Sequence, residues 1–198
     1  MGVSERLTRH KEFMRRQILD AAREVFVKEG YESVSMRKIA ERIEYSPTTI
    51  YLYFRDKADL LNRLSEEVFA PLLRETERIM AESGDPVERL SRGLRTYVDF
   101  GLRNPNDYRL ALLTAQHGPV ERERPTAWRV YSWLRSTVEE CVKSGRFRSV
   151  DVSTAAQTLL AAVHGVTSLL IIHDQFPWVE REQLIDTVIA TAVAGFSA

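Results

Sequence analysis

The stretch SVSMRKIAERIEYSPTTIYLYFRDKADLL, residues 33–61, decides the fold of this 198-residue chain. It begins with Ser35, a hydroxyl residue that favours a helix N-cap, followed by apolar residues at helical spacing. These apolar residues are Met36, Ile39, Ala40 and Ile43. The pattern predicts a short helix with one face that must be buried.

A second short helix is predicted directly after the first. The apolar pattern breaks at Glu44 and Tyr45 and restarts at Ser46-Pro47, a hydroxyl cap followed by proline at the first helical position, where its missing N–H does no harm. At about 100° per residue, one side of this helix is predicted to be inner and the other outer. The inner side holds Pro47, Ile50 and Phe54, and the outer side holds Thr48, Thr49 and Leu52.

Two short helices joined by a tight turn are what a helix-turn-helix requires. The second helix must enter a major groove about 12 Å wide, so short outer side chains favour close approach. Flanking basic and tyrosine side chains reach phosphate oxygens and fix the register without reading sequence.

The residues of this stretch resemble a known family. The strings S-M-R-K-I-A-E-R-I and Y-S-P-T-T-I-Y-L-Y-F-R-D-K-A-D-L-L are similar to the DNA-binding signature of the TetR family of bacterial transcriptional regulators. Glu44 departs from the signature, because the family commonly has glycine in the turn. A non-glycine residue held there in a left-handed conformation costs about 1 kcal/mol.

The resemblance and the helix geometry together predict the DNA contacts. Thr48 and Thr49 face base edges, with Leu52 against a thymine methyl group, and Arg37 reaches a base or a phosphate. The remaining contacts are to phosphates. The full predicted DNA-binding set is Arg37, Ser46, Pro47, Thr48, Thr49, Tyr51, Tyr53 and Lys57.

Composition is that of a globular helical protein. Hydrophobic residues make up 44% and charged residues 28%, and nine glycines and seven prolines are few for a turn-rich β architecture. The net charge is zero, but residues 1–63 hold 13 Lys and Arg against 10 Asp and Glu, which leaves an acidic excess in the remainder. This asymmetry fits a basic N-terminal part that contacts DNA phosphates.

The sequence is expected to be cytoplasmic. A single cysteine favours a reducing compartment, and the polar start MGVSERLTRHKEF lacks the apolar core of a signal peptide. The longest apolar run, Leu159 to Ile172, is interrupted by polar residues and falls short of the roughly 20 residues of a membrane span.

We predict an all-α fold of about nine helices in two domains: a helix-turn-helix DNA-binding domain over residues 1–56 and a helical ligand-binding and dimerisation domain over residues 57–198. Residues 1–12 are interpreted either as a solvated terminus or as a basic arm that reaches a groove. A long helix starts at Lys57, and Pro71 predicts a kink or break near Ala70. Other helices are expected near residues 13–29, 87–103, 106–116, 126–144, 151–173 and 180–196.

The last two helices are apolar over more than one stripe, which favours pairing with a second subunit. The family resemblance implies the same, a homodimer joined by its last two long helices. Two heads on a two-fold axis then read a pseudo-palindrome. The predicted interface residues are Leu159, Val163, Val166, Leu170, Leu184, Val188 and Thr191.

Aromatic residues at helical spacing in the second domain are either core or the lining of a ligand cavity between helices. The resemblance, whose members commonly bind an effector in this domain, favours the cavity. His164 is interpreted as a hydrogen-bonded core or interface group, or as an effector contact. Residues 161–169 also resemble the Trp-His-Gly motif of one TetR C-terminal subgroup, with Val163 in place of the tryptophan. The predicted pocket residues are Tyr97, Phe100, Trp128, Tyr131 and His164.

The residue patterns of enzymes are missing from the sequence. There is no glycine-rich phosphate loop and no paired nucleophile and base, so we predict neither an enzyme nor a cofactor. His117, His164, His173 and the single cysteine lack metal-ligand spacing, which argues against a metal site. Cys141 is interpreted as a buried small hydrophobe or, alternatively, a redox sensor.

The helix-turn-helix pattern together with the family resemblance therefore predicts a sequence-specific DNA-binding transcriptional regulator. What the resemblance implies is a repressor released from a palindromic operator by a small-molecule effector. Effector binding would bias two states of the dimer, with the helix from Lys57 as the lever. The alternative is a helical homodimer that binds a small molecule or a protein partner without operator binding.

Overall fold

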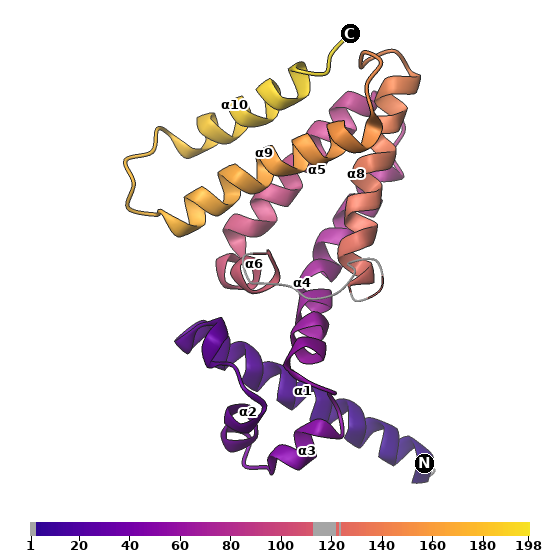
Figure 1. The fold of residues 1–198 in the computed structure, drawn as a ribbon. Coiled ribbons are helices and arrows are strands. Elements are labelled where there is room, and N and C mark those ends of the chain that lie inside the picture. Colours follow the sequence, from indigo (N-terminus) through magenta and orange to yellow (C-terminus); the bar gives the residue numbers. More distant parts are fainter. Residues whose placement is uncertain (1–2, 113–121, 123) are drawn as a thin grey trace.

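The computed structural model describes residues 3–112, 122 and 124–198, and these residues form nine α-helices and one 3-10 helix. The predicted all-α fold is confirmed (Figure 1). The helices are α1 (Val3–Glu29), η1 (Tyr31–Ser33), α2 (Met36–Arg42), α3 (Pro47–Tyr51), α4 (Lys57–Met80), α5 (Pro86–Arg103), α6 (Pro105–Leu112), α8 (Pro125–Lys143), α9 (Val152–Ile172) and α10 (Arg181–Ala194).

Helices α1, α2 and α3 form a head at one end of the molecule, and α4 leads from it to the other helices (Figure 1). Both predicted N-caps are confirmed, since the Ser35 side chain accepts from the Lys38 amide and that of Ser46 from the Thr49 amide. The apolar faces of α1 to α3 and the first turns of α4 share one core. Its buried members include Ile18, Ala22, Val25, Phe26, Ile39, Ile50, Phe54, Leu60 and Leu64.

The first helix is longer than predicted, because α1 starts at Val3 rather than near Phe13. Residues 3–12, interpreted from sequence as a terminus or an arm, are turns of this helix that extend away from the rest of the head. Extending an existing helix adds one hydrogen bond per residue without a new nucleation step, so these turns need no apolar stripe. Gly30, with a φ of 83°, follows the last turn.

Helix α4 runs without interruption through Pro71, so the predicted break does not occur. Pro71 itself is exposed, while Phe69 and Leu72 on either side are buried in the core of the second domain. Packing on both sides of the proline holds the helix together despite the missing hydrogen bond. One continuous element therefore connects the head to the second domain.

In the second domain α8 packs against α4, α5 and α9, and α5 also packs against α4 and α9. Helix α10 lies along α9 and α5 (Figure 1). Helix α9 has 21 residues and contains an 18-residue window with a mean hydropathy of 1.7, so by length and composition alone it is long and apolar enough to cross a membrane, unlike the shorter run Leu159 to Ile172. A core helix of a folded domain passes the same test. Helix α9 contacts α5, α8 and α10, as such a core helix does.

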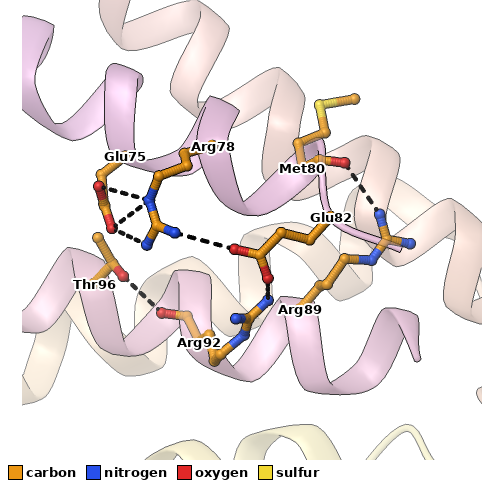
Figure 2. Close-up of polar contacts among 7 residues, drawn as sticks. All are labelled: Glu75, Arg78, Met80, Glu82, Arg89, Arg92 and Thr96. Atoms are coloured by element: carbon orange, nitrogen blue, oxygen red, sulfur yellow. Dashed lines mark hydrogen bonds and ion pairs between the residues drawn. The ribbon is translucent and has the colours of Figure 1, made fainter. Parts of the chain in front are cut away.

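The far end of α4 is tied to α5 by a chain of charged residues (Figure 2). Arg78 donates to Glu75 at 2.6 Å and to Glu82 at 3.2 Å, and Glu82 in turn accepts from Arg92 of α5 at 2.5 Å. Arg89 of α5 also donates to the carbonyl of the last residue of α4 at 3.4 Å. Each half-exposed pair stabilises little by itself, but together they fix the end of α4 that lies away from the head.

Candidate DNA-binding surface and ligand cavity

The recognition helix α3 has the inner and outer sides that its sequence predicts, except that Pro47, predicted on the inner side, is exposed. Ile50 is completely buried and Phe54 is 3% exposed, whereas Leu52 is 75% exposed. Thr48 is exposed and Thr49 is half-buried. The Thr49 hydroxyl lies 3.0 Å from the Ser46 hydroxyl, so these two side chains share a hydrogen bond at the start of the helix. The outer side is short and open enough to approach a groove.

The turn between α2 and α3 begins with a hydrogen-bonded motif that ends α2. Glu44 has a φ of 61°, which confirms the left-handed conformation expected there. Its amide donates to the Glu41 carbonyl at 3.3 Å, and the Tyr45 amide donates to the Ala40 carbonyl at 2.9 Å. This pair of hydrogen bonds is the Schellman pattern that ends a helix with a left-handed residue. The usual turn geometry is thus reached without glycine.

The other predicted DNA-contacting residues lie around α3 and differ in exposure and in their partners. The Arg37 side chain is exposed and pairs with Glu41 at 2.9 Å. Pro47 and Tyr51 are exposed and Tyr53 is half-buried. Lys57 is occupied within the head, because its ammonium donates to the Tyr31 carbonyl at 2.8 Å and lies 4.2 Å from the centre of the Tyr31 ring.

Sequence reasoning missed Arg15 of α1. Its guanidinium donates to the carbonyl of Tyr53 at 3.3 Å and lies 5.7 Å from the centre of the Phe54 ring, beside the end of the recognition helix. Nothing in the local pattern of α1 indicates this position, because the contact joins residues 38 apart. Arg15 therefore adds a positive charge next to α3.

A cavity of about 560 Å³ lies between α4, α5, α8 and α9. Its volume is within the range of small-molecule sites, about 300–1,000 Å³. Most of its wall is apolar. The lining includes Phe69, Leu72, Leu94, Tyr97, Arg124, Trp128, Tyr131, Trp133, Gln157, Leu160 and His164.

Four of the five predicted pocket residues line this cavity, namely Tyr97, Trp128, Tyr131 and His164. Phe100 does not line it and packs instead against the apolar core. It lies three residues beyond Tyr97 on α5, and the helical period alone did not separate the cavity side of α5 from its neighbouring core side. Gly93 of the same helix leaves the space that the ring of Trp133 fills.

Tyr97, Tyr108 and His164 form a hydrogen-bonded cluster at the cavity wall. The Tyr108 hydroxyl lies 2.7 Å and the Tyr97 hydroxyl 3.1 Å from His164 Nδ1, and the two hydroxyls are 3.2 Å apart. Burial raises the pKa of Tyr97 and raises that of Tyr108 to about 12, and it lowers the pKa of His164. At neutral pH all three groups are uncharged. The cluster therefore offers hydrogen bonds rather than charge.

Tyr108 itself was not identified from sequence. It is completely buried and fits because Gly101 of α5 has no side chain, as a Cβ there would lie 2.7 Å from its ring.

Four residues predicted at the dimer interface are instead inside the chain's own core. Leu159, Val163, Val166 and Leu170 are at most 6% exposed within a single chain, so they offer no surface to a partner. Apolar residues recur at helical spacing on both the core side and an interface side of such a helix. The sequence therefore does not distinguish the two sides. On α10, Leu184 and Val188 are half-buried and Thr191 is exposed.

A different stripe of α9 faces outward. Leu169 is 44% exposed and Ile172 is 51% exposed. They share a helical side with the exposed Thr158 and the half-buried Ala162 and Gly165.

Two further sequence predictions concern Cys141 and metal binding. Cys141 is fully buried, and burial raises its pKa to about 11, so it stays a neutral thiol. Over residues 3–112, 122 and 124–198 no cluster of metal-ligating side chains is found. His117 lies outside the described residues.

Comparison with known families and proteins identifies the chain. The profile for bacterial regulatory proteins of the tetR family matches residues 18–64, and that for the tetracyclin repressor-like C-terminal domain matches residues 90–192, more than half of the sequence. The chain belongs to the TetR family. As a member of this family it is a DNA-binding transcriptional regulator.

Relatives of this TetR-family chain are themselves named as regulators. The fatty acid metabolism regulator protein of Bacillus subtilis strain 168 is 26% identical over 166 residues, 80% of this chain and 84% of the relative. The uncharacterized HTH-type transcriptional regulator YhgD of the same strain is 24% identical over 188 residues, 91% of this chain and 95% of the relative.

Solved structures share the fold. The crystal structure of the transcriptional regulator FadR from Bacillus subtilis in complex with stearoyl-CoA has a TM-score of 0.75 and 24% identity, with coverage of 91% of this chain and 98% of that one.

Proposed function

We propose that this TetR-family protein is a homodimeric repressor that a small molecule with an apolar chain releases from a pseudo-palindromic operator. The observation that carries the proposal is the cavity of about 560 Å³, because one of its walls is α4, the helix that leaves the DNA-binding head. A ligand in that cavity contacts the element that positions the head.

In this repressor, residues 1–56 are the DNA-binding domain and residues 57–198 are the ligand-binding and dimerisation domain. Thr48 and Thr49 contact base edges and Leu52 contacts a thymine methyl group. The phosphate contacts are those predicted from sequence, with Arg15 added. Lys57 acts through its positive field, since its ammonium is held by the head.

The second domain supplies the effector site. An apolar wall fits a ligand with an aliphatic chain, and the Bacillus subtilis matches support this chemistry. The relative is named as a fatty acid metabolism regulator, and the solved structure of FadR is in complex with stearoyl-CoA. We therefore place a fatty acyl compound first among candidate effectors.

Helix α4 couples the two sites. Phe69, Leu72 and Thr76 of α4 line the cavity, while Leu60 and Leu64 of the same helix belong to the core of the head. The charged chain in Figure 2 fixes the far end of α4 to α5. A ligand that displaces the middle of the helix must therefore reorient the head end, which changes the separation of two heads in a dimer.

The dimer forms through the outward stripes of α9 and α10. Exposed or half-buried apolar and small residues there allow close helix contact with a second copy. On α9 they are Thr158, Ala162, Gly165, Leu169 and Ile172, and on α10 they are Leu184, Val188 and Thr191.

The test begins with selection of bound sequences from a random duplex pool by the purified protein at about 150 mM salt. The proposal expects a pseudo-palindrome, whose complex a fatty acyl-CoA then dissociates. Thr48→Ala should weaken specific binding by about 1–3 kcal/mol while non-specific binding stays unchanged.

Weak binding without sequence preference at every salt concentration would reject operator reading. It would leave a helical dimer that binds a small molecule or a protein partner. A recovered palindrome that no acyl compound releases would reject the effector class alone.

A further inference from the structure

The cavity wall carries one formal charge. Among its described lining residues only Arg124 is ionised at neutral pH, and the other polar groups are neutral side chains such as Gln157, Thr76 and His164. Arg124 directly precedes α8 and is half-buried. A cation therefore lies in a wall that is otherwise almost entirely apolar.

Arg124 has no anionic partner within contact distance among the described residues. Its Nε is buried and makes no hydrogen bond to residues 3–112, 122 or 124–198. By contrast, Arg129, one turn further along α8, pairs with Glu77, and Arg89 pairs with Glu140.

The carboxylate whose charge acts on Arg124 is that of Glu66 on α4, but its oxygens are already used. They accept from the Thr126 amide at 3.1 and 3.2 Å and from the Thr126 hydroxyl at 2.6 Å. Glu66 thus caps the start of α8 from a different helix. Within the part of the chain that the structure describes, this arrangement leaves the neighbouring guanidinium without a hydrogen-bonded counter-ion.

A partly desolvated guanidinium without an anion is unfavourable, because it has lost water without gaining a partner. Burial accordingly lowers the pKa of Arg124. A planar guanidinium matches carboxylate and phosphate oxygens, and such charge-assisted hydrogen bonds are about twice as strong as neutral ones. A ligand that brings an anion to Arg124 removes this cost.

We propose that the effector is an anionic amphiphile, whose charged group pairs with Arg124 while its apolar chain occupies the rest of the cavity. This inference rests on the proposed effector site and adds the chemical class and the recognising residue. The charged group is a carboxylate or a phosphate, so both a free fatty acid and a phosphate-bearing acyl thioester belong to the class.

The test measures binding through tryptophan fluorescence, because Trp128 and Trp133 line the cavity. Four probes are titrated into the purified full-length protein: dodecanoic acid, dodecan-1-ol, dodecanoyl-CoA and free coenzyme A. The acid and the alcohol share the same chain and differ in charge. The thioester carries its negative charge on phosphates.

Wild-type protein should bind the acid, the thioester or both about 10- to 100-fold more tightly than the alcohol. Arg124→Gln should abolish this preference while the affinity for the alcohol stays within about twofold. Arg124→Lys should retain part of it. The matched control is Arg129→Gln, which removes an exposed arginine of the same helix and should behave as wild type.

The outcomes separate this inference from the proposed function. If the alcohol binds as tightly as both charged probes, or if the preference survives in Arg124→Gln, the anionic class or the role of Arg124 is rejected and the apolar effector site stands. If none of the probes binds to the wild-type protein, both the proposed effector site and the anionic ligand class are rejected. An Arg124-dependent preference for the acid identifies a carboxylate, and one for the thioester alone identifies a phosphate. Far-UV circular dichroism and melting temperature confirm that the variants fold.

Discussion

At the scale of single residues, Glu44 shows how the head tolerates a departure from its family's pattern. It is the one non-glycine residue with positive φ over the described part of the chain. The left-handed conformation places the Tyr45 amide on the Ala40 carbonyl and so sets the angle between α2 and α3. The strain of a Cβ in that region is offset by these hydrogen bonds.

Replacing Glu44 by glycine should relieve the strain without changing the turn. We expect Glu44→Gly to raise the free energy of unfolding by about 0.5–1 kcal/mol, the left-handed penalty less the extra entropy of glycine in the unfolded chain. Glu44→Ala keeps the Cβ and serves as the control. Urea denaturation compares them, and equal stability of the two variants would show that the turn is not strained.

At the scale of elements, the start of α8 depends on α4. Pro125 and Thr126 open the helix, the residue before them supplies no side-chain cap, and the cap comes from the Glu66 carboxylate. The hydrogen bonds tie the middle of the helix that leads to the head to the helix that borders the cavity. Movement of either helix therefore displaces the other.

We expect Glu66→Ala to lower the free energy of unfolding by about 1–2 kcal/mol, the usual cost of a lost cap. The neighbouring Glu67→Ala is the matched control. Its ion pairs with Arg16 and Arg23 are long, at 4.0 and 3.7 Å, and pairs of this kind contribute about 0–1 kcal/mol. Thermal and urea unfolding measure both. Equal losses would mean that the Glu66 hydrogen bonds do not stabilise the start of α8.

At the scale of the whole molecule, α9 has three different sides. One side belongs to the core through Leu159 and Val166, a second borders the cavity through Gln157 and His164, and a third faces outward at Leu169. Because one helix carries all three sides, the ligand cavity and the proposed dimer interface share α9.

The outward side predicts the oligomeric state. We expect wild-type protein to be a dimer and Leu169→Glu to be largely monomeric at micromolar concentration, because two buried carboxylates would face each other across the two-fold axis. Met80→Glu is the control, since Met80 is equally exposed, at 43%, on α4. Light scattering after size exclusion gives the mass. A dimeric Leu169→Glu would place the interface elsewhere.

The helices and the head could be predicted from the sequence because their signals are local. The caps at Ser35 and Ser46 and the alternation of Ile50 and Phe54 with the outward Thr48 depend on neighbours a few residues apart. Helix propensity, capping and the 3.6-residue period act over that range. The same local signals determined the all-helical class. The four predicted residues that line the cavity needed the family resemblance as well, because helical spacing alone fits core and cavity equally.

Tertiary structure alone decided what depends on distant partners. Arg15 meets Tyr53 and Glu66 meets Thr126 across 38 and 60 positions of sequence. Which apolar side of α9 is core was settled by packing against α5, α8 and α10. Among the described residues Arg124 has no hydrogen-bonded carboxylate, because the neighbouring Glu66 caps a helix. Burial and pairing are properties of three-dimensional surroundings, so periodicity names the candidates and packing selects among them.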